Sequence, residues 1–350
     1  MHETAPAVSA GSRVSLDELD LALVTALQVA PRAPWSQLAG PLGVDAATLS
    51  RRWARLREAG IAWVTCYPAA GQVGYAALAL IEVSCVPQAR EELAQTIARH
   101  PQALGVEVVS GSCDLLLTVA TGSMELMSSY VLALGRIASV TATRTHLVQH
   151  LNREGSRWRF DSLSRGQQRD LAEPGGGAAG GRAAVLTGEE RRLMLALGPD
   201  GRRPVAALAA ELGRPESSVR RALGTLLHGD SKAVLRCEAA LPHAGWHGTA
   251  TLWMSVAPAE LALAAEEMAQ LKETRLAAST ASEANLLSVV WLHALDDLAR
   301  YEARVAALIP SMRVLNRVVT LRWVKRMGRL LSEDGRSVAS VPMDLWQPIP

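Results

Sequence analysis

The stretch 48–60, TLSRRWARLREAG, carries four arginines within seven residues and has the period of an amphipathic helix. At helical spacing Leu49, Trp53 and Leu56 fall on one stripe, which favours a buried face. A neighbouring stripe gathers side chains that donate hydrogen bonds: Thr48, Arg51, Arg52 and Arg55. Two interpretations of this second stripe stay open, a solvated surface or a row that contacts a partner, because charge runs on helices are usually solvated.

The sequence around this stretch supports the second interpretation. Two helical patterns precede it, so that three are expected in all, over 16–28, 35–42 and 46–58. Asp17 and Ser36 lie near two of the helix starts, where such residues cap helices. A glycine in the break GVDA (43–46) separates the last two patterns, which predicts a helix-turn-helix whose final helix enters a DNA major groove. The apolar run IAWV (61–64) then predicts a wing or a connecting strand.

The chain also repeats itself. A shift of 170 residues places Leu23 on Leu193 and Gly43 on Gly213 without a gap. A shift of 171 places GYAALALIEVSCVP (74–87) on GWHGTATLWMSVAP (245–258). We therefore expect two copies of one unit of about 150 residues. The intervening EPGGGAAGGRAA has the composition of a flexible linker.

The second part of each unit alternates strand and helix patterns. In copy one the strands are expected over 75–84, 105–111, 114–120 and 140–151, and the helices over 88–100 and 124–137. This β-α-β-β-α-β order is the ferredoxin-like split βαβ. The predicted fold class is α+β, with two winged helix-turn-helix domains and two ferredoxin-like regulatory domains in tandem.

The domain boundaries follow from these patterns. They are a disordered tail (1–15), a first DNA-binding domain (16–66), a first regulatory domain (67–163), a Gly/Ala-rich linker (164–184), a second DNA-binding domain (185–238), a second regulatory domain (239–331) and a C-terminal tail (332–350).

Composition bounds the function further. The 350 residues have a net charge of only +2, which excludes a globally basic nucleic-acid coat but allows a locally basic element. The cysteines lack C-x-x-C spacing, so a disulfide framework or a zinc site is not expected. The N-terminus does not have the pattern of a signal peptide, and no stretch reaches the roughly 18 apolar residues of a membrane span. We expect a cytoplasmic protein without a metal, a cofactor or a membrane partner.

Taken together, the sequence resembles the Lrp/AsnC family of transcriptional regulators. In copy one the resemblance rests on LDELDLALVTALQVAPRAPWSQLAGPLGVDAATLSRRWARLREAGI (16–61), VVSGSCDLLLTV (108–119) and VTATRTHLV (140–148). In copy two it rests on 186–227, TASEANLLSVV (280–290) and RVVTLRWVKR (317–326). The resemblance implies sequence-specific binding of double-stranded DNA and a small effector, often an amino acid, near the loop between the middle two strands. It also implies association into homo-oligomers.

Candidate DNA contacts lie on the two final helices and before one of the second helices. They are Arg32, Thr48, Ser50, Arg51, Arg52 and Arg55 in copy one, and Ser218, Arg220 and Arg221 in copy two. Arginine suits phosphates and the guanine edge, and hydroxyls suit either phosphates or bases. For Arg32 a solvated loop position is the open alternative. Because the two stripes differ, the heads present different chemistry, and copy one is expected to supply more of the affinity.

Candidate effector contacts lie in the loop of copy one and on its last strand. They are Gly111, Ser112, Asp114, Thr143 and Thr145. Asp114 suits an ammonium group, and the open alternative is a carboxylate that closes a tight turn. For the threonines the alternative is an ordinary place on a strand. Copy two departs from the pattern, with Ala281 and Ser282 in place of glycine and Asn285 in place of the acid, which puts effector binding there in doubt.

An enzymatic alternative also stays open. His243 and His247 flank Trp246, and some proteins of this architecture resemble sirohaem decarboxylases, in which histidines and tyrosines act on a tetrapyrrole. Tyrosine is scarce here, and no phosphate loop, nucleophile elbow or metal-ligand spacing is present. We therefore expect a regulator without catalytic residues, whose two sheets pair within one chain as a pseudo-dimer. An effector at the sheet interface would then shift the placement of the heads.

Overall fold

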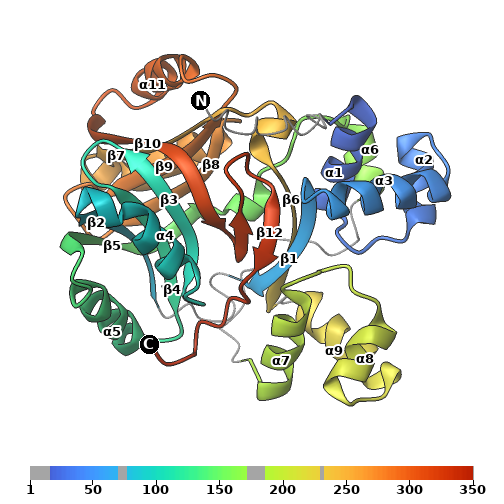
Figure 1. Cartoon of the computed structure of the whole chain (residues 1–350). Coiled ribbons are helices and arrows are strands. Elements are labelled where there is room, and N and C mark those ends of the chain that lie inside the picture. Colours follow the sequence, from blue (N-terminus) through green and yellow to red (C-terminus); the bar gives the residue numbers. More distant parts are fainter. Residues whose placement is uncertain (1–15, 70–76, 172–185, 229–231, 350) are drawn as a thin grey trace, which may run out of the picture.

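The computed structural model describes residues 16–69, 77–171, 186–228 and 232–349 (Figure 1). The first head consists of α1 (Glu18–Val29), α2 (Trp35–Leu42), α3 (Ala46–Glu58) and β1 (Ala62–Pro68). Asp17 and Asp20 form a capping box that starts α1. Gly43 ends α2 in the left-handed region, at φ 68°, which produces the tight turn into α3. Leu23, Leu38 and other fully buried side chains join the three helices in one core.

The second head repeats this plan. It consists of α7 (Gly188–Leu197), α8 (Val205–Leu212), α9 (Glu216–Leu227) and β6 (Ala233–Ala239). Thr187 and Glu190 form the capping box, and Gly213 ends α8 at φ 62°. Strands β1 and β6 pair antiparallel along their whole length, from Ala62 opposite Ala239 to Pro68 opposite Ala233. The two heads are therefore joined by a two-stranded sheet.

Each half then forms a four-stranded sheet with two helices. The first comprises β2 (Ala77–Cys85), α4 (Arg90–Ala98), β3 (Ala103–Ser110), β4 (Leu115–Thr121), α5 (Met124–Gly135) and β5 (Val140–Arg153). The second comprises β7 (Gly248–Ser255), α10 (Leu261–Gln270), β8 (Thr274–Thr280), β9 (Leu286–Leu292), α11 (Asp297–Leu308) and β10 (Arg313–Arg326). Short 3-10 helices lie at Pro87–Ala89, Gly155–Arg157, Leu241–Ala244 and Pro258–Glu260. The α+β fold class is confirmed.

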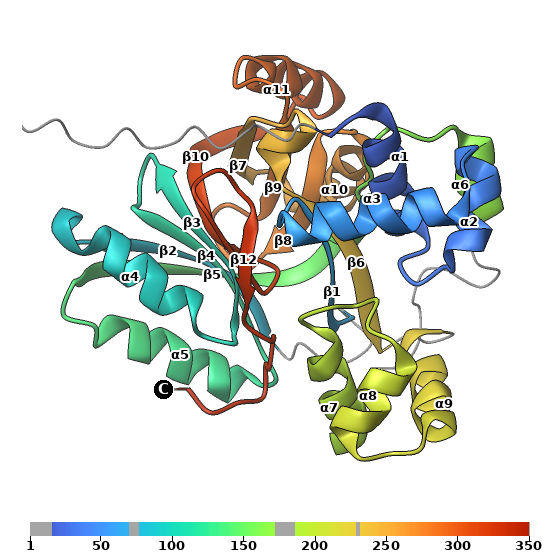
Figure 2. The ribbon, with the colours of Figure 1, turned by 45° about the vertical axis from the view of Figure 1, so that its right-hand side comes forward.

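The two sheets close into one barrel. Strand β5 pairs with β8 and strand β3 pairs with β10, so the eight strands form a ring in the order β10-β3-β4-β2-β5-β8-β9-β7. The helices cover the outside, over one apolar core for each half. Leu80, Leu116, Trp253 and Leu287 belong to a further core, formed by side chains of both copies. Both heads lie on the same side of the barrel (Figure 2).

Two segments differ from the sequence predictions. Within the predicted linker, Arg165–Leu171 forms α6, which packs on α1 and α2 because Leu163 and Leu171 enter the core of the first head. The predicted C-terminal tail instead forms β12 (Ser337–Ser340) on β11 (Arg329–Leu331), and its Met343 and Leu345 are buried. Apolar anchors order both segments. The predicted N-terminal tail and residues 172–184 of the linker lie outside the described residues.

In the part of the chain that the structure describes, no helix is both long and apolar enough to cross a membrane. The four cysteines are buried free thiols.

Candidate DNA-binding helices and effector region

The recognition helix α3 has the two faces that its sequence predicts. Leu49, Trp53 and Leu56 are buried in the core of the head. Asp45 caps the helix, and its carboxylate accepts hydrogen bonds from the Thr48 amide at 2.8 Å and the Thr48 hydroxyl at 2.7 Å. Arg51 is exposed and donates to the Thr48 hydroxyl at 3.2 Å. At the exposed start of α3, the Arg51 guanidinium is thus positioned by Thr48, which is itself bonded to the capping residue Asp45.

The next arginines on the stripe are paired inside the head. Arg52 donates to Asp17 at 2.6 Å and to Asp20 at 2.9 Å, and Arg55 donates to Asp20 at 2.5 Å. The Asp20 side chain is only 1% exposed, so these arginines neutralise a buried carboxylate. Burial opposes ionisation of Asp17, yet the bonds from Arg52 and from the Asp20 amide hold the pKa of Asp17 below its ordinary value. Both guanidinium groups are therefore already engaged by the acids at the start of α1.

The prediction for Arg32 is corrected. Its guanidinium donates to the carbonyls of Gly201 at 2.5 Å and Arg203 at 2.9 Å, in the loop between α7 and α8. Arg202 returns the contact and donates to the carbonyls of Pro31 at 2.6 Å and Ala33 at 2.9 Å. These two arginines clamp the heads together instead of lying free for phosphate.

In the second head the arginines on the exposed face of α9 have fewer ion-pair partners. Arg220 and Arg221 are exposed on α9, and Ser218 is half-buried, like its counterpart Thr48. Arg220 lies 3.9 Å from Glu216. The carboxylate that corresponds to Asp20 is Glu190, which accepts from Lys232 at 2.8 Å. The acid of α7 is thus neutralised by a lysine outside the reading helix.

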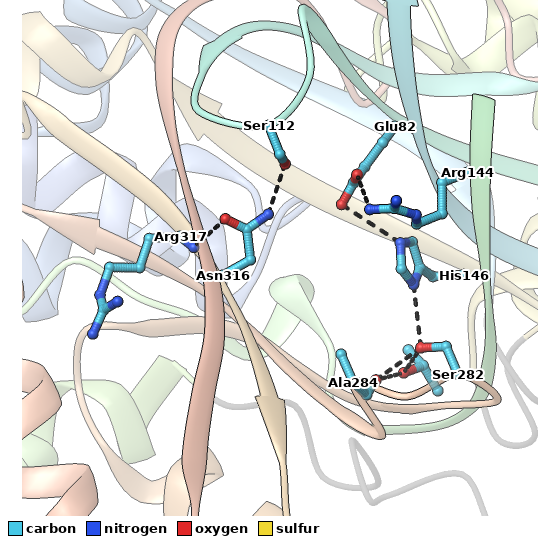
Figure 3. A network of polar contacts seen from close by, with 9 residues as sticks. Glu82, Ser112, Arg144, His146, Ser282, Ala284, Asn316 and Arg317 are labelled. Carbon is cyan, nitrogen blue, oxygen red and sulfur yellow. Dashed lines mark hydrogen bonds and ion pairs between the residues drawn. The ribbon is translucent and has the colours of Figure 1, made fainter. Parts of the chain in front are cut away.

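The predicted effector loop is packed against the other copy. Gly111 has φ 112°, and a Cβ there would lie 3.0 Å from the Arg317 carbonyl of β10. The Ser112 hydroxyl accepts from Asn316 at 2.7 Å, and Figure 3 shows this bond bridging the loop to β10. Glycine at 111 permits both the positive φ and the close approach.

Asp114 has its own structural partners. One carboxylate oxygen accepts from the Cys85 amide at 2.8 Å, and the other accepts from Arg90. The corresponding Asn285 makes a similar connection, because it accepts from the Val256 amide at 3.0 Å and donates to the Val256 carbonyl at 2.8 Å. This geometry favours the alternative that the sequence left open, a side chain that closes the end of the hairpin.

The prediction for Thr143 and Thr145 is also corrected. They lie opposite Val83 and Ile81, and cross-strand partners share a face, so both threonines face the helical layer over α5. The alternate residues Arg144 and His146 lie on the inner face instead.

A polar network on this inner face was missed from the sequence. Glu82 accepts from Arg144 at 3.3 Å and lies 3.5 Å from His146, whose other ring nitrogen lies 3.2 Å from the Ser282 hydroxyl of copy two (Figure 3). The His146 ring packs on Trp253, with centroids 4.1 Å apart. The signal was the single carboxylate within the apolar strand LALIEVS.

Two residues of the enzymatic alternative, Trp246 and His247, line a cavity of about 100 Å³. His243 lies 3.4 Å from Asp334, whereas Trp246 stacks on His293 with ring centroids 3.9 Å apart. Beside Trp246 lies a cleft of about 940 Å³, lined by Trp158, Arg157 and further basic side chains. Over the described ranges, no group of three or more His, Cys, Asp or Glu side chains has an arrangement that could hold a metal ion.

Comparison with known proteins identifies the architecture. An AsnC-type helix-turn-helix domain matches residues 16–57, and a Lrp/AsnC ligand binding domain matches residues 78–154. The HTH-type transcriptional regulator AldR of Mycolicibacterium smegmatis is 33% identical over 144 residues, which cover 39% of this chain and 83% of AldR. The HTH-type transcriptional regulator FL11 of Pyrococcus horikoshii is 29% identical over 143 residues, 41% of this chain and 95% of FL11.

One solved structure resembles nearly the whole chain. The siroheme decarboxylase NirDL, solved with an iron-uroporphyrin III analogue, has a TM-score of 0.55 and 15% identity, and the match covers 89% of this chain and 93% of that one. At this identity the likeness concerns the fold. The matched domains and the identity with AldR carry the family assignment, and with the helix-turn-helix of α1 to α3 they show that the chain belongs to the Lrp/AsnC family of transcriptional regulators.

Proposed function

We propose that one chain acts as a pseudo-dimeric, DNA-binding regulator whose two unlike heads read one asymmetric operator. The observation that carries this proposal is the double connection between the heads. The β1–β6 sheet joins them, and the reciprocal bonds of Arg32 and Arg202 hold the loops before their second helices together. The heads therefore have a fixed spacing within one chain.

The DNA contacts are assigned to the exposed stripes of α3 and α9. In head one they comprise Thr48, Ser50, Arg51, Arg52 and Arg55, and in head two Ser218, Arg220 and Arg221. Arg51 and Arg221 are both exposed, and the ion pairs on α1 occupy Arg52 and Arg55. The structure thus narrows the expected advantage of head one, because two of its three arginines already have carboxylate partners.

Footprinting on an operator selected from genomic DNA tests this proposal. We expect two unlike half-sites, and Arg51→Ala and Arg221→Ala should each remove protection of a different one. Arg300→Ala is the charge-matched control, since its side chain is 76% exposed and pairs with Asp297 on α11. A perfect palindrome that is insensitive to Arg221→Ala would show instead that two chains present two copies of head one.

We further propose that the protein works in the cytoplasm, that an effector changes the relative placement of the heads, and that chains associate into homo-oligomers. Light scattering of the purified protein tests the association, and a mass of a single chain at all concentrations would contradict it.

A second candidate function rests on the cleft beside Trp246. Its volume and its basic, aromatic lining suit a large planar anion, and the NirDL structure has a related fold. We propose no catalysis there. Titration with iron-uroporphyrin distinguishes the two candidates, because a shifted absorption band that Arg157→Ala abolishes would favour the tetrapyrrole function.

A further inference from the structure

Another, smaller cavity lies where the barrel meets the sheet that joins the heads. Its volume is about 110 Å³, and both copies line it. Tyr67 of β1 and Arg236 of β6 lie on the side of the heads, and Leu78, Leu104, Leu276 and Val289 are among the barrel residues. A ligand in this cavity would touch the regulatory sheets and the strand that carries the second head.

Three buried arginines line the cavity. Arg236 of β6, Arg275 of β8 and Arg326 of β10 are 3%, 8% and 3% exposed. All three are close to the same carboxylate, that of Glu238, which is 1% exposed. Arg236 is ion-paired with it, Arg275 lies 3.2 Å away and Arg326 lies 3.6 Å away. Three cations thus share one buried acid.

The remaining acids of the cavity do not balance this charge. Glu107 is buried, and burial raises its pKa to about 7 despite a hydrogen bond from Thr320. Glu107 is therefore only partly ionised at neutral pH. Glu154 also lines the cavity but is half-buried, so its charge is better solvated than those of the arginines.

Several N–H donors of the cavity lining have no hydrogen-bond acceptor among the described residues. They are the two terminal guanidinium nitrogens of Arg236, whose Nε faces Glu238, the Nε atoms of Arg275 and Arg326, and the indole nitrogens of Trp291 and Trp323. An unsatisfied buried donor destabilises the fold, and the destabilisation is larger when the donor is charged. Buried arginines with open donors at a cavity are the chemistry that recognises a carboxylate, which accepts two parallel bonds from one guanidinium.

The arginines are also held in position. The Arg275 guanidinium lies over the Trp291 ring at 4.7 Å, and Arg326 lies between the rings of Trp63 and Trp291, at 5.4 Å from each centroid. Cation–π contacts stabilise a desolvated guanidinium without occupying its N–H groups. The open Nε donors of Arg275 and Arg326 are therefore pre-oriented.

We propose that this cavity binds a small organic carboxylate that lacks an ammonium group, such as a short-chain 2-oxo acid, and that this ligand is the effector of the proposed regulator. The carboxylate lies on Arg236 and Arg275, and the apolar part packs against Leu276 and Val289. The volume excludes a tetrapyrrole, since a cavity of about 150 Å³ holds a molecule the size of benzene. An ammonium group would be poorly bound, because Glu238 is already shared by three arginines and Glu107 is only partly ionised.

The site exists once in each chain because the duplicated copies have diverged. At a shift of 171, Arg275 corresponds to Leu104, and Trp291 corresponds to Ala120. The basic half of the cavity thus comes from copy two, and the apolar Leu78 and Leu104 come from copy one. A symmetric dimer of either copy alone would lack this combination of a basic side and an apolar side.

The ligand would act on the heads through β6. Arg236 and Glu238 belong to this strand, and Arg326 of the barrel donates to the carbonyl of Ala239 at the end of β6. A carboxylate that draws Arg236 toward the barrel changes the contacts of the strand that positions α9. This gives the effector different contacts in the two arrangements of the heads, which a shift of the equilibrium requires.

The test is calorimetry on the full chain with 2-oxoisovalerate, valine, inorganic phosphate and iron-uroporphyrin at constant ionic strength. We expect 2-oxoisovalerate to bind one per chain, and valine to bind at least tenfold more weakly. Arg236→Met and the cavity-filling Val289→Phe should each weaken 2-oxoisovalerate at least tenfold, and Val289→Phe keeps every charge. Arg300→Met is the matched control, with an unchanged affinity.

Several outcomes would overturn the inference. Equal binding by Val289→Phe would place the anion outside the cavity. Equal affinity for valine would refute the ligand class, phosphate alone would indicate an inorganic anion site, and no binding at all would leave a water-filled cavity. Operator binding, measured separately, keeps the two proposals distinguishable. A chain that binds 2-oxoisovalerate but not DNA would refute the proposed regulator function and retain the carboxylate site. A chain that binds DNA but not 2-oxoisovalerate would retain the regulator function and refute the site.

Discussion

The two heads have the same helices, the same capping boxes and the same glycine turns, but they differ in where the acid of the first helix finds its cation. In head one Asp20 is neutralised by Arg52 and Arg55 of the reading helix. In head two Glu190 is neutralised by Lys232, which precedes β6. A row of arginines on a recognition helix is therefore not necessarily available to DNA, because carboxylates of a neighbouring helix can already be paired with it.

The heads are nevertheless held together by equivalent contacts of Arg32 and Arg202. Removing these contacts should have the largest effect of the predicted changes, on the free energy of unfolding. Arg32→Ala and Arg202→Ala should each lower the free energy of unfolding by about 1.5–3 kcal/mol, since each removes charged hydrogen bonds from carbonyls of the opposite head. Urea denaturation measures this, with Arg300→Ala as the control. A large loss for one variant and none for the other would break the equivalence of the heads.

The next effect separates a free arginine from a paired one. Arg51→Ala should weaken operator binding by about 1–3 kcal/mol if it reads a guanine, and leave stability unchanged. Arg52→Ala should also destabilise the head, because Asp20 loses a partner while 1% exposed. Fluorescence anisotropy with the operator, together with urea denaturation, checks both. Equal stability of the two variants would contradict the role given to the α1 acids.

A smaller effect should appear when the acid itself is removed. Asp20→Asn releases Arg55 and leaves Arg52 paired with Asp17 alone. Operator affinity should therefore rise a few-fold, and its salt dependence should steepen as one more cation reaches a phosphate. Glu190→Gln is the matched variant in head two and should leave affinity unchanged, because Lys232 lies outside α9. An increase for both variants, or for neither, would erase the difference between the heads.

The smallest effect concerns pH. The pKa values of Asp17 and Glu190 lie below their ordinary values: burial opposes ionisation in both, but Arg52 and Lys232, respectively, outweigh it. Each ion pair therefore stabilises the fold above the ordinary carboxyl pKa and is lost as the pH falls through the folded value. Asp17→Asn and Glu190→Gln should destabilise at pH 7, and this loss should shrink as the pH falls below the ordinary carboxyl pKa of about 4.

Glu190→Gln should cost more than Asp17→Asn at pH 7, because the Asp17 side chain is 54% exposed and Glu190 is nearly buried. Thermal unfolding at pH 7 and pH 3 measures the difference, and a loss for Asp17→Asn that is as large at pH 3 as at pH 7 would rule out the electrostatic explanation.

The sequence predicted what depends on local periodicity. The buried stripe of Leu49, Trp53 and Leu56 and the glycine turn before it fixed the first head, and the alternating patterns fixed the regulatory sheets. The closure of those sheets into a barrel did not follow, because it depends on edge pairings such as β3 with β10, more than 200 residues apart.

The site was harder to predict for the same reason. A helical wheel places Arg52 on an outer stripe but does not contain Asp17, which comes from another helix 35 residues earlier. Thr143 and Thr145 were predicted as effector contacts because they are polar, yet the strand alternation places Arg144 and His146 on the inner face. Arg236, Arg275 and Arg326 lie on three separate strands, and only the folded barrel brings them to one acid.

The C-terminal segment bears on the order in which the protein is made. The Ser337 amide donates to the Gly60 carbonyl of head one at 2.8 Å, Asp344 pairs with Arg191 of head two at 2.5 Å, and the Gly122 amide donates to the Leu345 carbonyl at 2.9 Å. Residues 337–345 are thus made after both heads and the first sheet, and they contact all three. At roughly 5–20 residues per second, head one waits tens of seconds for this contact. The two heads of a nascent chain therefore gain these contacts only after residues 337–345 have been made.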